Sequence, residues 1–244
     1  NGKLRPLGIP TVRDRVVQTA LRNVLEPVFE REFAGHSYGF RPGRGAKDAL
    51  RRVDKLLRSG HRHVADADIK AYFDSIPKEA LMARVRERVS DGRVLSLLEQ
   101  YLSQPVMEAL KTWTPDAGTP QGAVISPLLA NLYLNPLDHL MARSGVEMVR
   151  YADDFVMLCR SREQAESALE AVRAWMEEAG LTLHPDKTRA VSMDENGSHF
   201  EFLGYRFVRD KNRDYRFPRP KSKKKLRDAL RPFIRRSNGN SLER

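Results

Sequence analysis

The chain has 244 residues, of which 41% are hydrophobic, enough for one large domain or two small ones. No apolar run is long enough to cross a membrane, no signal peptide is visible, and the single cysteine, Cys159, excludes an internal disulfide and a cysteine-rich zinc site. The net charge of +11 favours a polyanionic partner.

Apolar residues at helical spacing predict helices in five stretches of the chain. A capping pattern at Thr11 and Asp14 opens the first helix, and Pro27 is expected to end or kink it. The predicted helices cover residues 11–29, 46–57, most of 77–106, 126–141 and 161–180. Strands are predicted at residues 61–69, 148–152, 155–158, 181–193 and 199–208. This order predicts an α+β fold in which an antiparallel sheet is backed by helices.

The last part of the chain carries almost all of the excess charge. Residues 209–244 hold 14 Lys or Arg against 4 Asp or Glu, which is +10, whereas residues 1–208 hold 29 against 28, which is +1. Such a block favours contact with nucleic acid, and Tyr215 and Phe217 within it are candidates to stack on bases. The alternative is a solvated tail or a localisation signal. Because the chain starts with Asn and stops after this cationic pattern, we expect a fragment of a longer protein.

Two adjacent carboxylates interrupt the strand-like stretch RYADDFVML. Asp153 and Asp154 fit the tip of a hairpin, since Asp is a common turn residue, and that alone requires no function. A third carboxylate, Asp68, ends the predicted strand in HVADADI. Brought beside the turn, Asp68 and Asp153 would form an oxygen-only site of the kind that binds Mg²⁺, and two such ions support phosphoryl transfer.

Seven motifs from Leu4 to about Phe207 resemble, in order, those of the group II intron-encoded reverse transcriptase/maturase family of bacterial RNA-directed DNA polymerases. LRPLGIPTVRDRVVQTAL and SYGFRPGRGAKDAL resemble its fingers blocks, and DADIKAYFDSI and GTPQGAVISPLLANLYL its first two palm motifs. YADD resembles its metal-binding turn, LHPDKT the motif that follows, and FEFLGY its primer-contacting hairpin. The resemblance implies a right-hand polymerase with fingers and palm, and the start of a thumb at the C-terminus.

The resemblance also implies roles for individual residues. Two Mg²⁺ ions would be held by Asp68 and Asp153, with Asp154 second in the turn and the Ile69 carbonyl an additional ligand that also faces the nucleotide. The deoxynucleotide would be bound by Arg41 on its triphosphate, Lys70, Gln121, and Phe73 against the sugar. Lys187 would protonate the leaving pyrophosphate. The primer would contact Phe202, Leu203, Gly204 and Tyr205.

Several of these residues have a structural interpretation as well. Lys70 is equally suited to pair with a neighbouring carboxylate, Lys187 to a strand surface, and either Tyr72 or Phe73 to the core. Asp66 and Asp74 inherit no metal role, and the histidines show no ligand spacing.

The resemblance divides the chain into fingers (1–60), palm (61–207, with about 78–118 contributing to the fingers) and a basic segment leading into a thumb or maturase region (208–244). The partners that it implies are an RNA template and primer held as an RNA–DNA duplex, dNTPs and the protein's own intron RNA. It implies no membrane partner, and it leaves open whether the protein forms a homodimer. Cys159 is interpreted as a buried strand thiol, consistent with a reducing bacterial cytoplasm.

The predicted function is RNA-directed DNA polymerisation that supports intron retrohoming and splicing. Three alternatives stay open: an RNA-binding splicing maturase whose palm is only a scaffold, an RNA-directed RNA polymerase, and a CRISPR-associated reverse transcriptase. The three intact carboxylates argue against a pure scaffold, because clustered acids repel RNA. Phe73 and the FLGY hairpin argue against an RNA polymerase.

Overall fold

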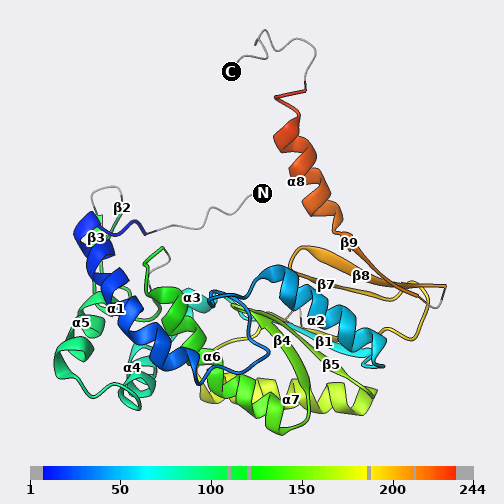
Figure 1. Cartoon of the computed structure of the whole chain (residues 1–244), viewed down its shortest axis with the longest axis horizontal. Coiled ribbons are helices and arrows are strands. Elements are labelled where there is room, and N and C mark those ends of the chain that lie inside the picture. The colour runs from blue at the N-terminus through cyan, green and yellow to red at the C-terminus, as the bar shows by residue number, and fades with distance from the viewer. Residues whose placement is uncertain (1–7, 109–110, 120–121, 186–187, 212, 235–244) are drawn as a thin grey trace.

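The computed structural model describes residues 8–108, 111–119, 122–185, 188–211 and 213–234 (Figure 1). The helices are α1 (Val12–Glu30), α2 (Ala46–Arg58), α3 (Tyr72–Ser75), α4 (Lys78–Arg86), α5 (Gly92–Leu102), α6 (Ser126–Arg143), α7 (Arg162–Glu178) and α8 (Pro220–Leu230). The strands are β1 (His63–Asp68), β2 (Val106–Glu108), β3 (Lys111–Trp113), β4 (Glu147–Tyr151), β5 (Asp154–Cys159), β6 (Arg189–Ser192), β7 (His199–Phe202), β8 (Tyr205–Asp210) and β9 (Arg213–Pro218).

The central sheet has the strand order β4-β5-β1-β6, and every pair in it is antiparallel. One face packs on α6 and α7 through residues such as Ala65, Phe155 and Met157. The other face packs on α2 and on the second sheet, β7-β8-β9, through Val64 and Val156 among others. Figure 1 shows α7 below the central sheet and the second sheet above it. The predicted α+β fold, an antiparallel sheet backed by helices, is confirmed.

Of the two expected effects of Pro27, an end or a kink, the end is wrong, because helix α1 continues past Pro27 to Glu30. Its N-terminus is as predicted, with the Thr11 hydroxyl accepting a hydrogen bond from the Asp14 amide at 3.2 Å. Leu25 and Phe29 are 3% and 0% exposed on either side of the proline. This packing holds the last turn in place and outweighs the backbone hydrogen bond that proline cannot form.

The segment after the FLGY motif contains a strand that was not predicted. Residues 213–218, expected to belong to a basic tail, form β9 on the edge of the second sheet. Helix α8 follows, as its cationic helical pattern indicated, and none of its residues is buried. Figure 1 shows α8, in red, standing away from the rest of the molecule. Among the described residues, no helix is both long and apolar enough to cross a membrane.

Candidate active site

Three carboxylates meet at one end of the central sheet. Asp68, the last residue of β1, lies directly opposite Asp154, the first residue of β5. Tyr151 also pairs with Asp154, so Ala152 and Asp153 form a two-residue turn, in which Ala152 has a φ of 60°. The sequence placed both aspartates at the tip, whereas Asp153 alone occupies it. Because paired residues in antiparallel strands share a face, Asp68 and Asp154 face the same side of the sheet.

The FLGY turn contacts this cluster directly. The Leu203 amide donates a hydrogen bond to Asp154 Oδ2 at 3.3 Å. Leu203 and Gly204 have φ values of 49° and 79°, as a two-residue hairpin turn requires when both central residues are left-handed. Burial raises the pKa of Asp154 to about 6, opposed by the Leu203 hydrogen bond and reinforced by the charges of Asp153 and Asp68.

Asp66 joins the cluster, although the sequence reasoning gave it no role. It lies two residues before Asp68, on the same face of β1, and opposite Arg189 of β6. Its pKa is raised to about 7, chiefly by burial and also by the charges of Asp154, Asp68 and Glu201, against the lowering effect of Arg189. The period-two spacing in DAD was the signal that places Asp66 beside Asp68.

The donor set fits a hard divalent cation. The donor groups of the cluster are carboxylate oxygens. They repel one another in a partly buried site, and a bound cation would relieve this repulsion. In the described part of the chain no group of three His, Cys, Asp or Glu side chains converges closely enough to hold a metal by itself. The arrangement therefore suits Mg²⁺, which binds through one or two carboxylates together with substrate phosphates and water.

Ile69 is placed where its carbonyl oxygen can contribute to the site. It pairs with Leu183 in an antiparallel bridge directly after Asp68. The two hydrogen bonds of this bridge run from the Lys70 amide to the Thr182 oxygen at 2.8 Å and from the His184 amide to the Asp68 oxygen at 2.7 Å. The Ile69 oxygen takes part in neither of them. Lys70 itself is exposed.

The turn is held from beneath by a buried ion pair that the sequence reasoning missed. Arg150 and Asp138 are both fully buried, and the guanidinium donates to the two carboxylate oxygens at 2.8 and 2.5 Å. Arg150 Nη1 also donates to Asn131 Oδ1 at 2.9 Å and to the carbonyl oxygen of Ala152 at 2.8 Å. One guanidinium thus fixes the backbone next to Asp153 to helix α6, and the only sequence signal was an arginine inside an apolar strand.

The GFRPGR loop packs on the same turn. A Cβ added at Gly39 would lie 2.3 Å from the Ala152 nitrogen, so only glycine allows this approach. Asn131 Nδ2 donates to the Gly39 oxygen at 2.7 Å, which links the loop to the Arg150 network. The Tyr38 amide donates to the Arg150 oxygen at 2.9 Å. The fingers block and the YADD turn therefore form one rigid unit.

Arg41 has a different environment from the one predicted. Its side chain is 3% exposed, and Nη2 and Nε donate to the Glu30 carboxylate at 2.6 and 2.9 Å. Nη1 donates to the oxygens of Ala34 and Ser37 at 2.6 and 2.9 Å. These contacts hold the loop together and occupy the guanidinium, so gripping a triphosphate would require Arg41 to leave Glu30. Its role toward the nucleotide stays a prediction.

Phe73 lies on α3, partly buried, with its ring 6.3 Å from that of Phe40 and 5.7 Å from that of Tyr72. Tyr72 is the core aromatic of the pair, since it is 2% exposed and donates its hydroxyl to the Ala130 oxygen at 2.6 Å. The Thr119 amide donates to the Phe73 oxygen at 2.7 Å, which brings the GTPQG loop to α3. Gln121 and Lys187 lie outside the described residues.

Comparison with known proteins agrees with this geometry. The model of the reverse transcriptase (RNA-dependent DNA polymerase) family matches residues 1–207. Protein YkfC of Escherichia coli (strain K12) is 34% identical over 87% of this chain and 65% of its own length. The group II intron-encoded protein LtrA of Lactococcus lactis subsp. cremoris is 38% identical over 61% of this chain and 24% of its own length. The chain thus spans less than two thirds of either relative.

Among solved structures, apo telomerase from Candida tropicalis superimposes with a TM-score of 0.60 at 12% identity, covering 85% of this chain and 41% of that one. At this identity the likeness shows the fold alone. Together with the family match, it confirms the right-hand fold, while the family match and the identity with LtrA confirm the resemblance to group II intron-encoded proteins stated from the motifs. The chain belongs to the reverse transcriptase family.

Proposed function

We propose that this chain is the fingers and palm of an RNA-directed DNA polymerase that adds deoxynucleotides to a primer 3′-hydroxyl. The observation that carries the proposal is the register that sets Asp68 opposite Asp154, with Asp153 in the adjoining turn. Asp68 and Asp153 would hold two Mg²⁺ ions, with Asp154 and the Ile69 oxygen beside them. When bound, such ions activate the attacking hydroxyl and neutralise charge on the transferred phosphate.

The remaining residues would position the substrates. The turn at Leu203 and Gly204 holds the primer end close to the carboxylates, supported by its hydrogen bond to Asp154. Phe73 lies beside the GTPQG loop and would exclude a ribose 2′-hydroxyl by its bulk. Gln121 and Lys187 keep their proposed roles toward the nucleotide and the leaving pyrophosphate. The domain boundaries at 60 and 207 belong to the same proposal.

The test is Mg²⁺-dependent primer extension on an RNA template with the full-length protein. Asp153→Asn keeps the size of the side chain and removes its charge, and we expect at least a thousandfold loss of extension, on the order of what two-metal catalysis supplies. Glu178→Gln, the same chemical change on an exposed position of α7, is the matched control and should extend normally. Phe73→Ala should raise the incorporation of ribonucleotides.

A splicing role in complex with the protein's own intron RNA is the second candidate, favoured by the likeness to LtrA and by the basic C-terminal segment. Both roles fit one protein. Tight binding of intron RNA without any extension by the unmutated chain would favour a maturase with the palm as scaffold. Sedimentation of the same sample would decide whether the protein forms a homodimer.

A further inference from the structure

The second sheet has an outer face that the proposed active site does not use. Its inner face, with Phe200, Phe202 and Phe207, is buried against the central sheet. The register of β7, β8 and β9 puts two rows of side chains on the opposite face. One row is His199, Val208 and Tyr215, and the next is Glu201, Arg206 and Phe217.

Two aromatic rings stand exposed on this face. The rings of Tyr215 and Phe217 stack with centroids 5.9 Å apart and planes inclined by 15°, and the residues are 39% and 49% exposed. They lie on β9, one of the two edge strands of its sheet. An exposed edge strand is normally protected by charge, and β9 carries two exposed large rings in addition to its charged residues. Stacked exposed rings on an open sheet are the usual platform for unpaired bases.

Arginines border the rings. The side chains of Arg206 and Arg219 are 38% and 39% exposed, and each reaches the Glu201 carboxylate at 3.7 Å, too far for a hydrogen bond. Arg206 Nη2 contacts His199 Nε2 at 2.8 Å, while the Nε atoms of both arginines are buried and make no hydrogen bond among the described residues. The buried Nε atoms are out of reach of a ligand, but side chains 38% and 39% exposed, held to Glu201 only by contacts of 3.7 Å, leave both arginines within reach of a further acceptor.

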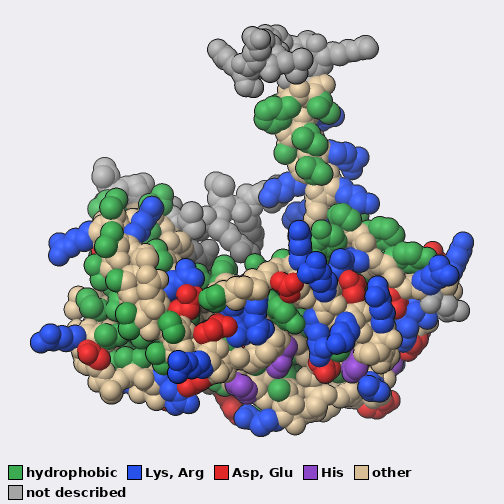
Figure 2. Space-filling model, viewed as in Figure 1, with side chains coloured by type: hydrophobic (Ala, Val, Ile, Leu, Met, Phe, Trp, Pro, Cys, Tyr) green, Lys and Arg blue, Asp and Glu red, His purple; other side chains and the backbone are tan. Residues whose placement is uncertain are grey.

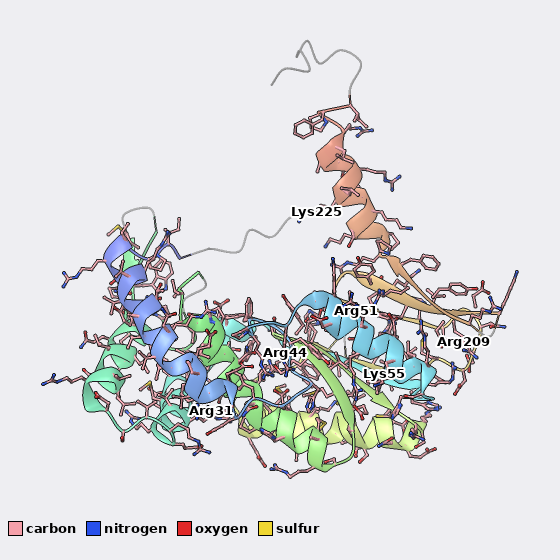
Figure 3. All side chains as sticks on the ribbon, viewed as in Figure 1. Arg31, Arg44, Arg51, Lys55, Arg209 and Lys225 are labelled. Carbon is pink, nitrogen blue, oxygen red and sulfur yellow. The ribbon has the colours of Figure 1, made fainter. Side chains whose placement is uncertain are left out.

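Helix α8 extends the cationic surface from the same point. Its start is fixed to the FLGY turn, because the Arg219 amide and the Ser222 hydroxyl donate to the Gly204 oxygen at 3.0 and 3.1 Å. Between 220 and 231 the exposed cations outnumber the single acid, Asp228: they are Lys221, Lys223, Lys224, Lys225, Arg227 and Arg231. Figure 2 shows both basic and apolar side chains along α8, and Figure 3 shows Lys225 projecting from it.

We propose that Tyr215, Phe217, Arg206 and Arg219, here called the β9 platform, bind an unpaired stretch of RNA. The rings would stack on bases, and the arginines and the first turn of α8 would contact phosphates. A duplex cannot use the rings in this way, because its bases are already stacked and paired. The platform is distinct from the primer contacts at 202–205, and its binding of RNA does not depend on polymerase activity.

The test measures binding of the full-length protein to a labelled 20-nucleotide RNA and to the same RNA annealed to its complement, by fluorescence anisotropy. The double variant Tyr215→Ala/Phe217→Ala should weaken binding of the single strand by at least about fivefold, the loss of one stacked base, and binding of the duplex by less than about twofold. The matched control, Tyr215→Phe/Phe217→Tyr, exchanges the rings and should bind as the unmutated protein does.

A second measurement locates the contact. RNA carrying 5-iodouridine should crosslink on irradiation to Tyr215 or Phe217, as identified by mass spectrometry. Arg206→Gln/Arg219→Gln should lower the slope of log affinity against log salt by about 1.4, or about 0.7 for each lost phosphate contact.

The platform would be overturned by unchanged affinity in the double alanine variant, by equal losses for single strand and duplex, or by crosslinks only elsewhere. Weakened binding to anionic vesicles with unchanged RNA binding would overturn it in favour of a membrane surface. Primer extension on a short duplex template distinguishes this result from failure of the polymerase proposal, because the platform variants should keep it.

Discussion

The YADD turn and the β9–α8 segment handle charge in opposite ways. Beneath the turn, Arg150 and Asp138 are completely buried, and each polar group is matched by a short hydrogen bond. In β9 and α8 the ion pairs are long or partly exposed, and α8 buries nothing. Burying a charge pair costs desolvation and returns fixed geometry, whereas exposed charges stay hydrated and free to meet a partner. The buried pair therefore fixes the backbone of the YADD turn, whereas the exposed charges of β9 and α8 suit binding of a polyanion.

Among the changes that test this contrast, removal of Arg150 should cause the largest loss of stability. Arg150→Met leaves the Asp138 carboxylate buried without its partner and frees the Ala152 oxygen, so we expect a loss of about 3–5 kcal/mol in the free energy of unfolding. Urea denaturation followed by circular dichroism measures it.

The double variant Arg150→Met/Asp138→Leu distinguishes the effect of Arg150 on the stability of the protein from its effect on the position of the YADD turn. It removes both charges, so much of the lost stability should return. Primer extension should stay impaired, because nothing then fixes the Ala152 oxygen. Full recovery of extension in the double variant would contradict a positioning role for Arg150.

The carboxylate cluster should make stability depend on pH in the opposite direction from ordinary acid denaturation. The pKa of Asp154 is raised to about 6 and that of Asp66 to about 7. The folded state therefore holds more protons than the unfolded chain between about pH 4 and 7, and the free energy of unfolding falls as pH rises, by up to about 1.4 kcal/mol per pH unit for each group.

Urea denaturation in EDTA from pH 5 to 8 checks this dependence. Asp66→Asn should flatten the profile and be more stable than the unmutated chain at pH 8. Adding Mg²⁺ at pH 8 should stabilise the unmutated chain by binding the folded state. A profile that rises with pH in EDTA would contradict the raised pKa values.

The contact between the fingers loop and the turn should be sensitive to a single methyl group. In Gly39→Ala the new Cβ would meet the Ala152 nitrogen at 2.3 Å, so the loop or the turn must move. We expect a loss of about 1–3 kcal/mol in stability, as for other overpacked sites, with a larger proportional loss of primer extension. Gly35→Ala is the control, because a Cβ there meets nothing within 4 Å. Equal behaviour of the two variants would show that the loop adapts.

The sequence predicted correctly those parts of the site in which the acidic residues lie within or beside a recognisable run of apolar strand residues. The strand that ends at Asp68 and the hairpin around Asp153 were predictable because apolar residues surround the acids. The buried pairing of Arg150 was not, since its partner Asp138 comes from a helix twelve residues earlier, and only packing brings them together. Asp66 was given no role because the family resemblance assigns it none, although the period-two spacing of DAD places it beside Asp68.

Strand β9 was missed for a related reason. Its inner-facing positions are charged, and their partners are other charges: Asp214 meets Arg62 at 3.4 Å, and Arg216 meets Asp54 of α2 at 2.8 Å. The apolar residues of this strand, Tyr215 and Phe217, lie on the exposed face and the charged ones face inward, so its alternation does not have the usual pattern of a strand with its apolar side on the core. The roles of Arg41, Gln121 and Lys187 toward the nucleotide stay predictions.

The smallest expected effect comes from one of these ion pairs. Arg216 and Asp54 have side chains 31% and 28% exposed, so solvent screens their attraction. Arg216→Gln should cost only about 0.2–1 kcal/mol in the free energy of unfolding, several times less than Arg150→Met. The loss should shrink further in 1 M salt, whereas that of Arg150→Met should not. If both variants lose the same free energy of unfolding, the inner face of β9 is anchored as firmly as the YADD turn. The contrast between the buried charges of the turn and the exposed charges of the β9–α8 segment would then fail.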